Sequence, residues 1–153
     1  MPSFRSTRVV KHTPDQMFAL VADVERYPEF LPLCEDLRIV RRQTDAEGRE
    51  VLVAAMSVGY KAMRETFTSR VTLDRAAGAI LVEYVDGPFK RLENRWEFRP
   101  AGPGTAVEFS IAYEFRSMAL GLLIGAMFDK AFRRFAEAFE KRAHEVYGPP
   151  VAA

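Results

Sequence analysis

The stretch SMALGLLIGAMFDKAFRRFAEAFEKRAHEVY, residues 117–147, decides the fold because it has the periodicity of one long amphipathic helix. Its predicted apolar stripe consists of Leu120, Leu123, Ile124, Met127, Phe128, Ala131, Phe135, Ala138 and Phe139. A helix of this length would span about 45 Å at 1.5 Å per residue. In a chain of 153 residues, we expect it to lie across the whole domain and to bury this stripe against the remaining elements.

The sequence before this helix is typical of short strands separated by tight turns. We expect strands at residues 4–11, 37–44, 50–58, 60–73, 79–86, 93–98 and 105–115. Thr13-Pro14-Asp15-Gln16 predicts a helix start with a capping box, and prolines limit a second short helix to residues 24–30. The order predicts an α+β fold in which a curved, seven-stranded antiparallel sheet wraps around the C-terminal helix.

Composition limits the class of protein. With 48% hydrophobic residues and twelve Phe, the chain is expected to form one domain over residues 1–148, followed by a flexible tail at 149–153. The single cysteine, Cys34, allows no internal disulfide, and His12 and His144 have no neighbouring ligands at metal spacing. A net charge of +1 argues against a DNA-binding polyelectrolyte. We therefore expect no metal and no cofactor.

The N-terminus lacks the apolar region of a signal peptide. The longest apolar run, residues 118–128, is too short to cross a bilayer. We expect a soluble cytoplasmic protein, with transient peripheral contact with the inner membrane surface as a further expectation.

Three separated segments carry a family resemblance. DVERYPEFLPLC (23–34), GYKAMRETFTSRVTLD (59–74) and GPFKRLENRWEF (87–98) resemble the coenzyme Q-binding protein family. That family includes a mitochondrial coenzyme Q chaperone and a bacterial ribosome-association toxin, and it belongs to the polyketide cyclase/dehydrase superfamily. The resemblance covers nearly the whole chain and implies the helix-grip fold of START and Bet v 1-like domains. Asn94 stands where the family pattern has glycine.

The resemblance implies a non-enzymatic domain that binds ubiquinone in an apolar cavity between sheet and C-terminal helix, as a chaperone that supports respiratory electron transport. Strand parity and the helical stripe give the predicted lining. These apolar candidates are Phe67, Tyr84, Phe89, Trp96, Phe109, Tyr113, Met127 and Phe135. Lys61 and Glu65 are the polar candidates. No residue is expected to be catalytic.

The inward parity of Glu65 and Lys61 has two interpretations. If Phe67 and Val71 face inward, Glu65 does so as well unless a bulge shifts the register. A buried carboxylate requires a partner, so Glu65 is expected to pair with Lys61 or Lys90, or to contact a polar ligand head group. Asn94 or a lysine is also expected to be able to donate to a quinone carbonyl.

Two apolar segments also have two interpretations. Gly87-Pro88 and Phe89 form either a flap over the cavity or a hairpin turn with a buried phenylalanine. The elbow at residues 23–34 forms either the cavity's second lip or a helix pair packed on the sheet edge.

Two other functions remain as alternatives. A ribosome-association protein would bind a ribosomal subunit through basic residues such as Arg38, Arg41 and Arg42, or through the outer face of the C-terminal helix. A polyketide cyclase-like enzyme would need an acid and a base in the cavity, and the candidates for these are Glu65, Lys61, Tyr84 and Tyr113.

Overall fold

The structure is a computed structural model that describes residues 3–60 and 62–149. Its elements are β1 (Ser3–Val10), α1 (Pro14–Ala22), the 3₁₀ helix η1 (Val24–Glu29), β2 (Cys34–Thr44), β3 (Glu50–Tyr60), β4 (Met63–Asp74), β5 (Ala79–Asp86), β6 (Phe89–Ala101), β7 (Gly104–Phe115), α2 (Met118–Arg133) and α3 (Phe135–Tyr147). Across these residues no helix is both long enough and apolar enough to cross a bilayer.

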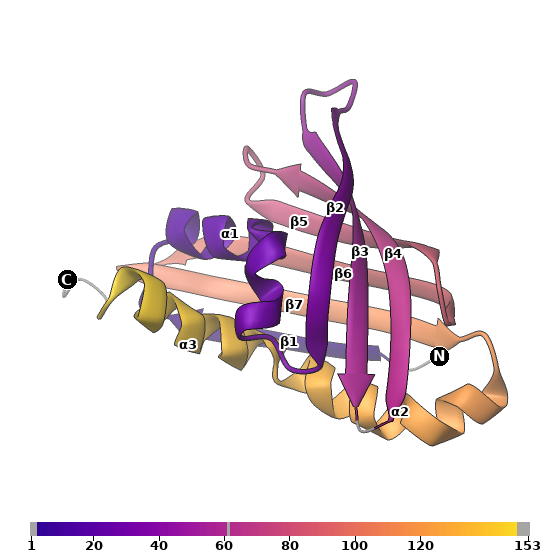
Figure 1. Cartoon of the computed structure of the whole chain (residues 1–153). Coiled ribbons are helices and arrows are strands. Elements are labelled where there is room, and N and C mark those ends of the chain that lie inside the picture. Colours follow the sequence, from indigo (N-terminus) through magenta and orange to yellow (C-terminus); the bar gives the residue numbers. More distant parts are fainter. Residues whose placement is uncertain (1–2, 61, 150–153) are drawn as a thin grey trace.

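The seven strands form one antiparallel sheet in the order β1-β7-β6-β5-β4-β3-β2. The chain therefore forms a meander from β2 to β7, and β1 joins the far edge by pairing with β7. Figure 1 shows the sheet curling so that β2, β3 and β4 run across β6, β7 and β1, while α2 and α3 lie along the open side. This arrangement confirms the predicted curved sheet with C-terminal helices.

The C-terminal helical segment is broken, contrary to the prediction of one continuous helix. At Arg134 the backbone has φ −100° and ψ −3°, and its N–H bonds to the Ala131 carbonyl three residues back. The tighter turn ends α2 at Arg133, and α3 begins at Phe135. No proline or glycine marks this position, which is why sequence reasoning missed the break.

The predicted apolar stripe is correct in its central part and wrong at Leu123. Ile124, Phe128, Ala131 and Phe139 are buried, whereas Leu123 is 74% exposed on the solvent side of α2. Phe132 is buried in its place. Within α2 the buried stripe therefore consists of Ile124, Phe128, Ala131 and Phe132, and Leu123 lies outside it.

Hydrogen bonds tie α3 to the start of the chain. The capping box of α1 is formed as predicted, because Thr13 Oγ1 accepts from the Gln16 N–H and Gln16 Oε1 accepts from the Thr13 N–H. The Tyr147 hydroxyl donates to the Gln16 carbonyl at 3.0 Å. The buried His12 ring donates through Nε2 to the Gly148 carbonyl, also at 3.0 Å. These contacts fix the end of α3 against α1.

Two strands begin at least three residues earlier than the sequence predicted. β2 starts at Cys34 rather than residue 37, and β6 starts at Phe89 rather than residue 93. Gly87 and Pro88 are therefore the whole connection between β5 and β6. Gly87 has φ +141°, and a Cβ there would lie 2.5 Å from the Phe67 Cβ. The hairpin thus requires glycine both for its conformation and for its close approach to β4.

Two glycine substitutions should have opposite effects on stability. At Gly104 an added Cβ would lie 2.0 Å from the Val10 carbonyl oxygen, where β1 meets β7, so Gly104→Ala should lower the free energy of unfolding by about 1–3 kcal/mol. At Gly125, inside α2, it would lie 3.8 Å from a Phe115 ring carbon, and Gly125→Ala should raise that free energy by about 1 kcal/mol. Urea denaturation of both variants measures the difference. Equal midpoints would contradict the close approach of β1 and β7.

Candidate functional site

An apolar cavity of about 80 Å³ lies between the concave face of the sheet and the helices. Its lining comes from η1, the segment between η1 and β2, six of the strands, α2 and α3. These residues are Val24, Tyr27, Leu31, Pro32, Leu33, Leu37, Ala54, Met56, Val58, Phe67, Ser69, Val71, Val82, Leu92, Asn94, Trp96, Ile111, Phe128, Ala131, Phe132, Phe135 and Phe139. Nearly all of these side chains are apolar, so the cavity suits a hydrophobic ligand.

The structure brings three of the predicted site residues together in this lining. Phe67 on β4, Trp96 on β6 and Phe135 on α3 all face the cavity. The strand parity of Phe67 and Trp96 and the helical face of Phe135 were therefore predicted correctly, and the predicted position of the cavity between sheet and C-terminal helices matches the structure.

The other predicted apolar residues do not line the cavity. These are Tyr84, Phe89, Phe109, Tyr113 and Met127. Phe109 is the cross-strand neighbour of Trp96, with ring centroids 4.7 Å apart, and Tyr113 contacts Phe132 at 5.1 Å. Phe109 and Tyr113 pack beside lining residues on the same face of the sheet, because parity selects a face but not which part of that face stays unfilled.

Phe89 is the centre of an aromatic cluster, which favours the hairpin interpretation over the flap. It is 0% exposed, and its ring lies 4.9–6.1 Å from the rings of Phe67, Tyr84, Tyr113, Phe115 and Phe128. The Tyr84 hydroxyl accepts a hydrogen bond from the Phe89 N–H, and burial raises the pKa of Tyr84. This cluster fills one end of the space between sheet and α2.

The predicted polar candidates have different outcomes. Lys61 lies outside the described residues. Glu65 is half-buried, has the same parity as Phe67, and does not line the cavity. Lys90, its other predicted partner, instead pairs with Glu114 at 3.8 Å. Among the described residues Glu65 has no ion pair, so the prediction that it pairs with Lys90 is wrong.

Asn94 is the hydrogen-bond partner of the indole N–H of Trp96. Its Oδ1 accepts a hydrogen bond from the Trp96 indole N–H at 3.0 Å, and its Nδ2 donates to the Ser110 carbonyl at 2.9 Å. A buried indole N–H without a partner would be destabilising. Asn94 thus orients the indole in the cavity wall, and one of its two amide N–H donors is engaged with the backbone.

The elbow at residues 23–34 forms a lip of the cavity. Tyr27, Leu31 and Leu33 line it, as one of the two predicted interpretations requires. The Tyr27 hydroxyl donates to the Val21 carbonyl, and burial raises the pKa of Tyr27. Leu33 has a positive φ of 68°, an unfavourable conformation for a branched side chain, and its carbonyl accepts from the Gly59 N–H at 3.0 Å.

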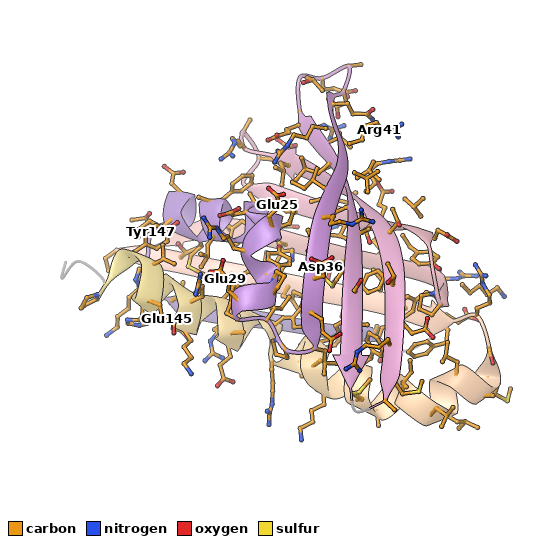
Figure 2. All side chains as sticks on the ribbon, viewed as in Figure 1. Glu25, Glu29, Asp36, Arg41, Glu145 and Tyr147 are labelled. Atoms are coloured by element: carbon orange, nitrogen blue, oxygen red, sulfur yellow. The ribbon has the colours of Figure 1, made fainter. Side chains whose placement is uncertain are left out.

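Contacts with α3 hold this lip. Phe30 packs on Phe139 with ring centroids 5.1 Å apart, and the Arg142 guanidinium lies over the Phe30 ring. Arg142 also pairs with Glu29 on η1 and with Glu145 on α3; Figure 2 labels both carboxylates. These contacts are partly exposed to solvent, so they close the lip more weakly than the core contacts do.

Sequence reasoning missed several lining residues. Ala54, Ser69 and Ala131 are small side chains on facing surfaces, and their small volume leaves the cavity open. Their strand and helix parity was readable, but nothing in the sequence distinguishes small residues that border a cavity from small residues in close packing. Ser69 differs from the others because its buried Oγ has no hydrogen-bond partner among the described residues.

The described residues give little support for a nucleophilic cysteine or for a metal site. Burial raises the pKa of the Cys34 thiol to about 12, which keeps the thiol protonated. Within residues 3–60 and 62–149, no group of three His, Cys, Asp or Glu side chains is arranged to hold a metal ion.

Comparison with known proteins agrees with this geometry. The profile of the family described as polyketide cyclase / dehydrase and lipid transport matches residues 10–140. The ribosome association toxin RatA of Rickettsia prowazekii is 34% identical over 149 residues, covering 95% of this chain and 99% of that protein. The coenzyme Q-binding protein COQ10 homolog B of Xenopus laevis is 27% identical over 95% of this chain and 59% of its own length.

The fold is also that of known START proteins. A START superfamily protein from Mycobacterium smegmatis has a TM-score of 0.77 at 20% identity, covering 94% of this chain and 98% of that chain. The resemblance and the helix-grip fold predicted from the sequence are therefore confirmed. The chain belongs to the polyketide cyclase/dehydrase and lipid transport family and has a START-like fold with an apolar cavity.

Proposed function

We propose that this protein binds an isoprenoid quinone, ubiquinone in particular, in the cavity and supports respiratory electron transport as a quinone chaperone. The observation that carries the proposal is the apolar cavity enclosed by sheet, lip and C-terminal helices. A relative named for coenzyme Q binding, similar over 95% of this chain, supports the choice of ligand.

The energetics support an isoprenoid ligand. Moving one isoprene unit from water into an apolar site contributes about 3 kcal/mol, so two or three buried units outweigh the loss of freedom on binding. The cavity of about 80 Å³ is smaller than typical ligand pockets of roughly 300–1,000 Å³. Binding therefore requires the lip to move outward, and the rest of a long tail must remain outside the domain.

We propose binding without catalysis. Among the described residues that line the cavity there is no carboxylate, imidazole or ammonium group. The acid and base candidates Glu65, Tyr84 and Tyr113 lie outside the lining. A cyclase needs an acid or base within reach of its substrate, so this lining supports a carrier more than an enzyme.

Organic extraction of the protein purified from its own cells should release ubiquinone in stoichiometric amount. Mass spectrometry and ultraviolet absorption of the extract identify the quinone. Because Trp96 is the single tryptophan and lines the cavity, added quinone should quench its fluorescence in the emptied protein. An extract without quinone, together with unquenched Trp96 after incubation with quinone-loaded vesicles, would reject the proposal.

A charge placed in the cavity should weaken this binding. Phe135→Asp would put a carboxylate among apolar side chains, where desolvation makes it unfavourable, and should reduce quinone affinity at least tenfold. Leu123→Asp, on the exposed side of α2, is the matched control and should bind as the natural protein does. Circular dichroism checks that both variants are folded. Retained binding by folded Phe135→Asp would remove Phe135 from the site.

A second candidate function is association with a ribosomal subunit. The relative named for ribosome association has the higher identity, 34% against 27%. One surface favours it: the β2–β3 hairpin projects beyond the rest of the sheet, and Arg41 lies on this projection (Figures 1 and 2). Arg38 and Arg41 are exposed and have no ion pair among the described residues, whereas Arg42 pairs with Glu25 and Glu50.

Reversing these charges should weaken any binding to ribosomal RNA. The Arg38→Glu/Arg41→Glu variant should sediment less with purified ribosomal subunits. The slope of the logarithm of its binding constant against the logarithm of salt concentration should become shallower by about two, because about two phosphate contacts are lost. Arg5→Glu/Lys11→Glu makes the same charge change at the opposite edge of the sheet and serves as control. Equal sedimentation of both variants would exclude the β2–β3 hairpin as the contact surface.

A further inference from the structure

Ser69 is a polar residue in an otherwise apolar part of the cavity wall. It lies on β4, is 6% exposed, and faces the cavity between Phe67 and Val71 on the same strand. Its Oγ is buried without a hydrogen-bond partner in the described part of the chain. Buried hydroxyl groups in folded proteins nearly always have a partner, so this atom requires an explanation.

The other polar side chains in the lining already have partners. Both ends of the Asn94 amide are engaged, one with the Trp96 indole and one with the Ser110 carbonyl. The Tyr27 hydroxyl donates to the Val21 carbonyl. Ser69 Oγ is therefore the one buried polar side-chain atom of the described lining that has no hydrogen-bond partner within the protein.

The strands on either side of Ser69 leave space for a ligand atom beside its hydroxyl. The residue opposite Ser69 on the neighbouring strand β3 is Ala54, a small residue that also lines the cavity. On the other side, a register shift between Thr68 and Ser69 interrupts the ladder with β5. Such bulges re-aim side chains. A small neighbour and an irregular ladder together leave space beside the hydroxyl.

We propose that Ser69 Oγ hydrogen-bonds an oxygen atom of the ligand, so that the cavity selects an apolar molecule that carries a carbonyl or hydroxyl group. This inference rests on the proposed function, in which that oxygen is a quinone ring carbonyl. A serine hydroxyl donates to a carbonyl and also accepts from a hydroxyl. A hydrocarbon without oxygen leaves Ser69 unpaired.

The position of Ser69 also orients the ligand. Along β3, its partner Ala54 is five residues from Gly59, which contacts the lip residue Leu33. At about 3.4 Å per residue, the distance along β3 from the level of Ser69 to the lip is roughly 17 Å. The lining residues with partial exposure include Pro32, Leu33 and Phe135, whereas Ser69 is buried. The oxygen-bearing ring therefore enters first, and the isoprenoid tail points toward the lip.

This role gives Ser69→Ala an effect on binding that a structural role would not give. The protein loses no internal hydrogen bond, so its midpoint of thermal unfolding should be unchanged or higher. Its affinity for a ubiquinone with a two-unit isoprenoid tail should fall about threefold to tenfold, the range expected for loss of one hydrogen bond. Its affinity for geranylbenzene, which has the same tail and no oxygen, should be unchanged.

Trp96 fluorescence measures the quinone directly, and geranylbenzene is measured by competition with it. Ser57→Ala on β3 is the control, because its hydroxyl bonds Thr66 and does not line the cavity. Ser69→Cys, with a weaker donor, should fall between serine and alanine and provides a second variant if alanine disturbs folding.

The outcomes separate this inference from the proposed function. If Ser69→Ala binds the quinone as tightly as the natural protein, the Ser69 contact is overturned and the quinone carrier remains. An equal loss of affinity for both ligands would also overturn it, because Ser69 would then act through cavity shape. If the natural protein binds no quinone, the proposed function fails and the Ser69 contact fails with it.

Discussion

The structure depends on one constraint: the concave, apolar face of a strongly curved sheet must be covered by a single layer of helix. Two surfaces of different curvature cannot stay in contact along their whole length. The break at Arg134 divides the helical layer into α2 and α3, and the bonds of Tyr147 and His12 hold its far end. Where the layers still diverge, side-chain volume decides whether the space is filled.

Aromatic residues fill that space at both ends and leave its middle open. On one side, the rings around Phe89 close the region between β6, β7 and α2. On the other, Tyr27 and Phe30 pack on Phe139. Between these clusters the facing positions hold Ala54, Ser69 and Ala131. The cavity is thus bounded by rigid rings and bordered by small residues, so its position follows from side-chain choice rather than from the course of the backbone.

The sequence predicted the fold class, the order of elements along the chain and the placement of the cavity, because alternation and capping are local signals that this chain carries clearly. Strand alternation placed Phe67 and Trp96 on the cavity side, and helical periodicity placed Phe135 there. It failed for Phe89 and Tyr113, since parity does not tell an aromatic residue that borders a cavity from one that contacts other rings. The break at Arg134 and the unpaired hydroxyl of Ser69 depend on tertiary contacts that no local pattern encodes.

The pairing of β1 with β7 has a consequence for synthesis of the chain. Ser3 lies opposite Ala112. The ribosome must therefore add about 100 further residues before the partner of the first strand emerges, which takes roughly 5–20 s at ordinary translation rates. The β2–β6 meander forms from neighbouring strands within that time. Its concave face then stays uncovered until α2 and α3 follow. During translation the future cavity is an open apolar trough, and this nascent stage is the one most exposed to chaperones and to aggregation.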